Sequence, residues 1–154
     1  MRSFCKPIGL SSDIYCTFFS GLASFILSRN RNDSNSVLIC KGDASVMEMQ
    51  EWSDHCEWNF KNKVLLLKAE QCYAMGDVGG AQFFYQESID SAREHKFIHE
   101  EGIAHELFGY FNLQLGKVLD GQRHLEQACQ LYTKWGAEEK VSSMRLNRDC
   151  VMSN

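Results

Sequence analysis

Histidines near the middle of the chain are the residues whose spacing most suggests catalysis. His99 and Glu100 are followed by His105, an arrangement that raises the question of a zinc site. Two histidines that hold zinc from one helix face must lie four residues apart, whereas His99 and His105 are six apart. His95 and His99 have the required spacing, but we expect a helix break at Lys96 to separate them. The sequence therefore predicts no bound metal.

Two glycine-rich turns raise the question of phosphate binding. A phosphate loop follows the pattern G-x-x-x-x-G-K-[ST], in which backbone amides surround the anion. Before Gly116-Lys117, Phe111 takes the position of the first glycine, and Val118 replaces the final serine or threonine. No serine or cysteine has a recognisable nucleophile setting. We expect a protein that is not an enzyme and binds no cofactor.

The run Ala104-His105-Glu106-Leu107 resembles the phospho-acceptor box of histidine kinases, where H-E-L is followed by arginine, threonine and proline. Phe108-Gly109-Tyr110 follows here instead. Leu107 and Phe108 also continue an apolar stripe of helical spacing. We interpret these residues as helix packing without phosphotransfer.

The seven cysteines are irregularly spaced, and no two of them form a C-x-x-C pair. We expect free, buried thiols in a reducing compartment, which favours a cytoplasmic location. The cysteines are Cys5, Cys16, Cys40, Cys56, Cys72, Cys129 and Cys150.

Composition favours one all-α domain. The 154 residues include a single proline, while most of the eleven glycines stand at segment ends. The net charge of −4 and the lack of a basic face argue against a nucleic-acid partner.

Hydrophobic periodicity and capping residues predict about seven helices. Asn59 and Asp77 are expected N-caps, and Gly76, Gly116 and Gly136 are expected helix ends. The expected domain spans 12–146, between tails 1–11 and 147–154. Its helix pairs are predicted at 12–56, 59–95 and 98–135, with a cap helix at 137–146. Ser36–Cys40 is apolar enough for a strand, so the state of residues 36–44 is left open.

The apolar run from Ile14 to Leu27 could be mistaken for a targeting segment. Its fourteen residues are too few to span a bilayer, which takes about 17 to 25. Asp13 directly precedes the run, and Pro7 interrupts the approach to it. A buried helix is the better interpretation, with no membrane association.

The chain repeats itself at a shift of forty residues. Small residues align on the expected helix crossings, including Ala69 with Gly109 and Ala81 with Gly121, and the turn residue Gly76 aligns with Gly116. Small side chains at a crossing let two helix backbones approach. An ordinary helical bundle whose glycines coincide by chance is the alternative.

The run Met75-Gly76-Asp77, followed by Ala81 to Ile89, resembles the tetratricopeptide pattern L-G-D … A-x-x-x-[FY]-x-x-A-[LI]. Gly109 to Ala128 matches it more loosely, with Asn112 where a large residue is usual. The resemblance implies a right-handed superhelical stack of antiparallel helix pairs, an α-solenoid.

A second resemblance covers about residues 13–141. The strings Asn59 to Glu70, Phe97 to Glu101 and Trp135-Gly136-Ala137-x-x-Lys140-Val141 look like the helical arm of large signalling proteins that join an ATPase to a sensor histidine kinase. The resemblance implies a detached arm that relays conformational change.

The hypothesis that we carry forward is a non-catalytic module that binds a protein or peptide, with self-association as a further possibility. This hypothesis predicts a ligand groove lined by the first helix of each pair. The resemblance to tetratricopeptide units places Lys63, Leu66, Glu70, Tyr73, Ile103, Glu106, Tyr110 and Gln114 in that groove. The tyrosines could equally pack against a neighbouring helix. The lysine- and asparagine-rich carboxylate clamp of some family members is missing from this set, so a different ligand is expected.

Overall fold

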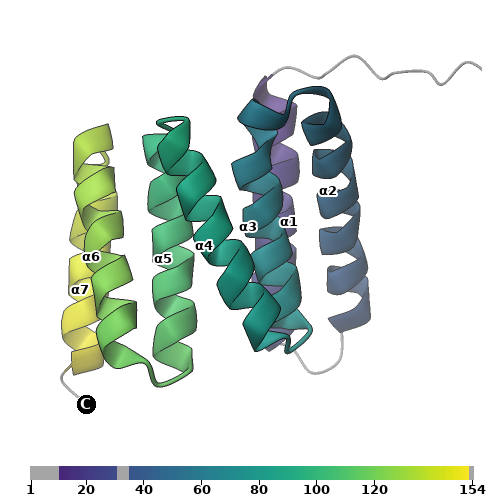
Figure 1. Ribbon diagram of the computed structural model, residues 1–154. Coiled ribbons are helices and arrows are strands. Elements are labelled where there is room, and N and C mark those ends of the chain that lie inside the picture. The colour runs from purple at the N-terminus through teal and green to yellow at the C-terminus, as the bar shows by residue number, and fades with distance from the viewer. Residues whose placement is uncertain (1–10, 31–34, 153–154) are drawn as a thin grey trace, which may run out of the picture. The chain divides into compact units, whose positions relative to one another are not determined.

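The structure, a computed structural model, describes residues 11–30 and 35–152, and side chains within 12–29 and 36–146. These residues form seven helices and no strand, so the all-α prediction is confirmed (Figure 1). The helices are α1 (Ser11–Asn30), α2 (Asn35–His55), α3 (Glu57–Ala74), α4 (Val78–Glu94), α5 (Ile98–Gln114), α6 (Val118–Trp135) and α7 (Glu138–Met152).

The chain divides into two compact units at a point inside α4. The first unit is Met1–Phe84 and the second is Tyr85–Asn154. In the first unit, α1, α2 and α3 pack on one another as neighbouring antiparallel helices (Figure 1). Their fully buried apolar side chains include Phe18, Phe25, Met49 and Leu67. The apolar run from Ile14 to Leu27 is thus a helix with one buried face.

The second unit is built on the antiparallel pair α5 and α6, with α7 packed against α6. Tyr85, from the end of α4 that belongs to this unit, is fully buried and stacks on Phe108 with ring centroids 5.1 Å apart. Phe111 lies at 5.3 Å from the same ring. The apolar stripe predicted to include Phe108 therefore does contribute to a core.

The helix ends repeat every twenty residues. At Gly76 the chain takes a φ of 80°, and the amide of Gly76 donates to the Tyr73 carbonyl while that of Asp77 donates to the Cys72 carbonyl. This pair of bonds satisfies carbonyls that a helix end otherwise leaves without partners. The same two bonds and a positive φ recur at Lys96, Gly116 and Gly136.

The predicted N-caps have different outcomes. The Asp77 carboxylate accepts a hydrogen bond of 2.9 Å from the Gly80 amide, as expected of a cap of α4. The prediction for Asn59 is wrong, because α3 already begins at Glu57 after Cys56. The amide of Asn59 instead donates to the Cys56 carbonyl, and the tight junction with α2 decides the start of this helix.

Close helix crossings rest on glycine in both units. In the second unit, a Cβ added to Gly109 would lie 2.8 Å from Leu125 Cγ and 3.1 Å from the Gly121 carbonyl oxygen. In the first unit, a Cβ on Gly21 would lie 2.7 Å from the Cβ of Ser45. The predicted role of Gly109 and Gly121 at a crossing is confirmed. The crossing of α1 with α2 has a glycine of its own, Gly21.

The structure assigns a segment that was left open and revises expectations at helix ends. Residues 36–44 are helical within α2, since packing on α1 and α3 outweighs their strand propensity. Leu115 and Trp135 continue the helical spacing of apolar residues, but both are exposed because they stand at helix ends. Helix α7 continues past the predicted end at Leu146 to Met152, inside the predicted tail 147–154.

The prediction of buried thiols holds only in part. None of the described cysteines is in a disulfide. Cys129 is buried and Cys56 and Cys72 are half-buried, but Cys16 and Cys40 are exposed. Cys5 and the Cys150 side chain lie outside the described part of the chain, as does the tail up to residue 10.

The turn at Lys96 yields a stability prediction. Lys96 has a φ of 59°, a conformation that costs an L-residue about 1 kcal/mol or more and costs glycine little. Lys96→Gly should therefore raise the free energy of unfolding by about 1 kcal/mol in urea titrations. Gly116→Ala, at an equivalent turn, should lower it by a similar amount. A loss of stability in Lys96→Gly would contradict this account of the turn.

The crossing at Gly109 yields another. Gly109→Ala should destabilise the chain by about 1–3 kcal/mol, because the new methyl meets the backbone of α6. Gly79→Ala is the matched control, since the added Cβ would have only Asp77 nearby, at 3.8 Å. The control should leave stability unchanged or raise it by up to about 1 kcal/mol. Equal losses in the two variants would mean that the crossing tolerates a wider spacing.

Candidate protein-interaction surface

The four groove residues predicted on α3 are mostly covered. Lys63, Leu66 and Glu70 are buried, and Tyr73 is half-buried. Glu70 is 1% exposed, and Arg29 of α1 donates to its carboxylate at 2.6 Å. The same guanidinium lies over the Tyr73 ring, 4.1 Å from its centroid. In the first unit this set therefore serves to hold α1 against α3, and its role as a ligand surface stays a prediction.

Other polar side chains of α3 are also used within the first unit. Lys63 donates to the Asn59 carbonyl at 3.3 Å, and its ammonium lies 5.8 Å from the Tyr15 ring centroid. Gln71 donates to Asp43 of α2 at 2.7 Å. Since these contacts bind α3 to its neighbours on two sides, α3 is better described as the central helix of this unit.

The four groove residues predicted on α5 are more accessible toward the end of the helix. Ile103 is buried, Glu106 is half-buried, and Tyr110 and Gln114 are exposed. Spacings of three and four residues place these side chains along one face of α5. The second unit thus presents an accessible part of the predicted surface.

Glu106 is the centre of this face. One carboxylate oxygen accepts a hydrogen bond of 2.8 Å from the Tyr132 hydroxyl of α6, and the other pairs with the Lys140 ammonium of α7 at 2.8 Å. The Glu106 side chain is only 13% exposed, whereas that of Lys140 is 47% exposed. A single carboxylate therefore connects three helices, and the cation that balances its charge remains reachable from solvent.

The two tyrosines beside Glu106 stay protonated. Burial raises the pKa of Tyr132 far above its usual value, and the Glu106 charge and hydrogen bond add to the effect. Burial also raises the pKa of Tyr110, followed by the nearby charge of Glu106. Both phenols are consequently hydrogen-bond donors over the physiological pH range.

Sequence reasoning missed two aromatic residues that extend this face. His99 precedes Ile103 by one turn of α5, and its ring stacks on Trp135 of α6 with centroids 4.1 Å apart. Trp135 is 56% exposed although its ring is held by this stack. His55, His95 and Trp135 recur at the forty-residue spacing, which is a signal visible in the sequence, but it did not show that the indole would lie on the surface.

We name this face the Tyr110 surface, and it comprises His99, Glu106, Tyr110, Gln114, Trp135 and Lys140. It runs along α5 and is flanked by α6 and α7, all within the second unit. Lys140 belongs to the W-G-A-x-x-K-V element noted in the sequence, and its role in that element is now visible as the ion pair with Glu106.

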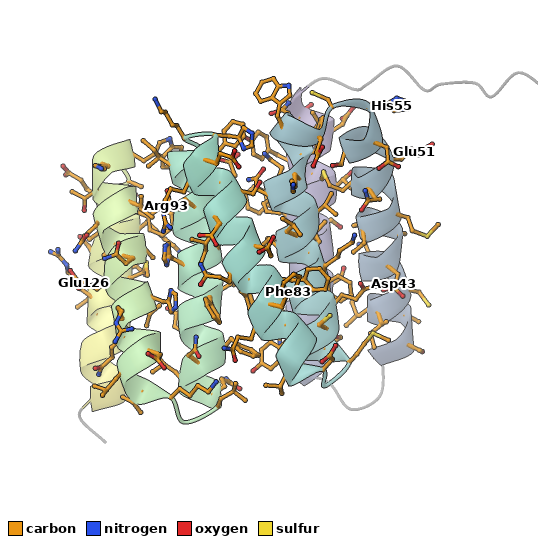
Figure 2. The ribbon with its side chains drawn as sticks, viewed as in Figure 1. Asp43, Glu51, His55, Phe83, Arg93 and Glu126 are labelled. Carbon is orange, nitrogen blue, oxygen red and sulfur yellow. The ribbon has the colours of Figure 1, made fainter. Side chains whose placement is uncertain are left out.

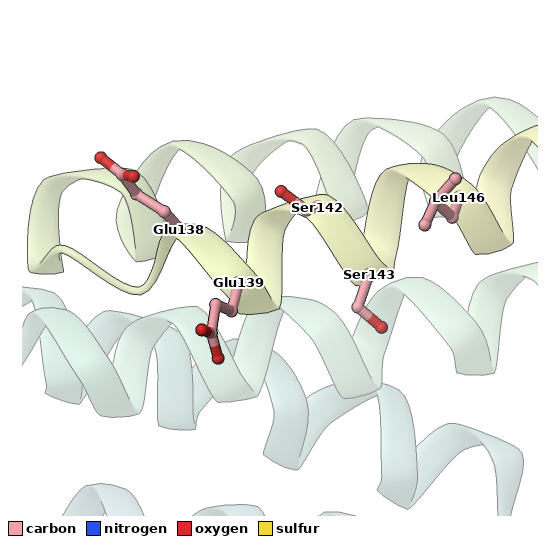
Figure 3. A pocket seen from close by; sticks show the side chains of 5 residues that line it. All are labelled: Glu138, Glu139, Ser142, Ser143 and Leu146. Carbon is pink, nitrogen blue, oxygen red and sulfur yellow. The ribbon is translucent and has the colours of Figure 1, made fainter.

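Two hollows elsewhere are less suited to a ligand. One, of about 530 Å³, is lined by Glu138, Glu139, Ser142, Ser143 and Leu146, which all come from α7 (Figure 3). Glu138 and Glu139 point to opposite sides of the helix, so they do not converge on one point. The other, of about 450 Å³, lies between α2 and α3. Its polar side chains bond one another, as Lys68 does with Gln50 at 2.8 Å and Lys61 with Glu57 at 2.9 Å.

Within the described residues, no three His, Cys, Asp or Glu side chains are grouped so as to hold a metal ion. None of the helices over the same residues combines the length and apolar character needed to cross a membrane. The chain matches no protein-family model, no curated protein and no solved structure.

The contacts of Glu106 predict an order of stabilities. Glu106→Ala should cost about 1–3 kcal/mol, because it leaves the buried Tyr132 hydroxyl without its acceptor. Tyr132→Phe should cost about 1 kcal/mol, and Lys140→Ala less than that, since its ammonium is largely solvated. Chemical unfolding of the three variants at neutral pH measures the order. A larger loss for Lys140→Ala than for Tyr132→Phe would show that the ion pair, and not the hydrogen bond from Tyr132, holds these helices.

Proposed function

We propose that this protein is a non-catalytic helical-repeat module that binds a peptide segment of a partner protein on the Tyr110 surface. The observation that carries the proposal is the row of accessible aromatic and hydrogen-bonding side chains along α5. The residues around Tyr110 are fixed by the buried bond between Glu106 and Tyr132, so binding would order few further side chains.

The chemistry of the surface fits a protein ligand. Tyrosine and tryptophan give large contact areas with little loss of side-chain entropy, and they are enriched where binding energy is concentrated. Tyr110 offers a protonated hydroxyl, and Gln114 adds amide groups that can bond a peptide backbone. The Glu106 and Lys140 charges balance each other, so the surface favours neither strongly acidic nor strongly basic segments. We place this activity in the cytoplasm, in keeping with the free thiols.

An alternative use of the same fold is a relay arm within a signalling histidine kinase. The W-G-A-x-x-K-V element supports it, since Gly136 forms the turn before α7, Lys140 pairs with Glu106, and Val141 is buried. Each of these residues fixes α7 to its neighbours, which is what a relay between two domains requires. A reading frame that continues into ATPase or kinase motifs in the full transcript would favour the arm.

Binding can be tested by selecting peptides from a displayed library on the purified chain and measuring their affinity by calorimetry. Tyr110→Ala should weaken the selected peptides at least about tenfold, because it removes the central aromatic contact. Gln130→Ala, an exposed change on α6 outside the Tyr110 surface, is the control and should leave affinity unchanged.

Two results would overturn the proposal. One is selected peptides that bind Tyr110→Ala and the unaltered chain equally well. The other is a library from which nothing is enriched, in combination with a folded chain in the same buffer. Sedimentation of the free chain separates peptide binding from self-association, which would cover the Tyr110 surface without any ligand.

A further inference from the structure

A histidine pair, with one ring buried and the other half-buried, joins α5 to α6 in the second unit. His105 of α5 is 4% exposed, and its Nδ1 lies 2.9 Å from Nδ1 of His124 in α6. The His124 ring packs on Phe108 with centroids 4.3 Å apart. On its other side, Nε2 of His105 lies 3.4 Å from Nη2 of Arg93, a residue of α4 that is labelled in Figure 2.

These contacts define which ring nitrogens carry hydrogen. A guanidinium can only donate, so Nε2 of His105 must be the acceptor of the contact with Arg93. A neutral His105 then has its hydrogen on Nδ1, which donates to His124. Nδ1 of His124 is the acceptor of that bond, and the hydrogen of its ring is on Nε2. Both rings are neutral in this arrangement.

A proton on either ring breaks the arrangement. On His124 it would sit on Nδ1 and place two N–H groups head to head at 2.9 Å. On His105 it would sit on Nε2 and face the Arg93 guanidinium. In both cases a hydrogen bond becomes a repulsive contact at the buried ring of His105, where burial disfavours the charged form.

We propose that the His105–His124 pair is a proton-sensitive joint, which holds α6 against α5 while both rings are neutral and releases it when one ring takes up a proton. The joint goes beyond peptide binding and does not depend on it. Because Tyr132 and Trp135 are also on α6, release of this helix would disturb the Tyr110 surface as well.

The charged groups around the joint do not cancel this effect. From α4, Arg93 opposes protonation of His105 and Asp90 favours it. From α5, the Glu101 carboxylate lies 3.9 Å from His105 Nε2, but Arg93 binds the same carboxylate at 2.9 Å. From α6, Asp120 favours a charge on His124 and Arg123 opposes it. These two pair with each other at 3.4 Å. Burial remains the largest influence on both rings, and it lowers both pKa values.

The direction of the pH effect follows from these shifts. The pKa of His105 falls from 6.5 to about 4 in the folded chain. A histidine with a lowered folded pKa favours the folded state above its unfolded pKa, and this contribution is lost as pH falls toward the folded value. Between pH 8 and pH 5, His105 alone should raise the unfolding equilibrium constant about 30-fold.

The first test is a long-range ¹H–¹⁵N NMR spectrum of the full chain, which reports the tautomer and protonation of each ring. The joint requires the Nδ1–H form of His105 and the Nε2–H form of His124 at pH 7.5, both unprotonated at pH 6. Assignment uses His105→Asn and His124→Asn. Fast exchange between tautomers, or ordinary titration of both rings near pH 6.5, would overturn the proposal.

The second test measures chemical unfolding at pH 8 and pH 5. In a His105→Asn/His124→Asn variant, the acid-induced rise in the unfolding constant should be about 30-fold smaller than in the unaltered chain. His55→Asn removes an exposed histidine of α2 and should keep the full pH effect (Figure 2). Parallel acid losses in the double variant and the unaltered chain would refute the joint. The NMR test on the unaltered chain decides the matter if the double variant does not fold.

Discussion

The left-handed residue that ends a helix every twenty residues is the constraint on which the rest of the structure depends. At Gly76, Lys96, Gly116 and Gly136 it satisfies the last carbonyls of one helix and begins the next helix two residues later. Constant spacing gives successive helices nearly equal length. Antiparallel helices of equal length then cross at a similar position along each helix. A small residue such as Gly109 is needed at that position.

Buried carboxylates supply the second level of organisation. A carboxylate removed from water must be paired, and a pairing partner on another helix fixes the position of that helix. In the first unit Glu70 of α3 pairs with Arg29 of α1, and in the second unit Glu106 of α5 pairs with Lys140 of α7. In each case a tyrosine lies beside the cation. The same residue types thus fasten helices in one unit and border an accessible surface in the other.

Local chemistry explains why most of the fold was predictable and where prediction stopped. Three of the turns can be predicted from their glycines, Gly76, Gly116 and Gly136. A capping aspartate or an apolar stripe then locates the helices between these turns. The helix break expected at Lys96 is present, but its left-handed conformation, taken without a glycine, could have been inferred only from its place in the twenty-residue spacing. The burial of Glu70 and the exposure of Trp135 depend on which helices pack around them. That information is distributed over distant residues, and neither the covering of α3 by its neighbours nor the contact of His105 with His124 could be read from spacing alone.

The proposed surface and the proposed histidine joint both lie on helix α5, so each would influence the other although neither requires the other. Ile103, Glu106 and Tyr110 point to one side of this helix, while His105 and Phe108 meet α6 and the core on another. A ligand that holds the neighbouring helices against α5 must also oppose the opening of the histidine pair, because both processes act on the same packing. By linkage, such a ligand lowers the pH at which α6 is released, and protonation weakens the ligand by the same factor. Both proposals therefore depend on the same property, which is how firmly α5 is held within its unit.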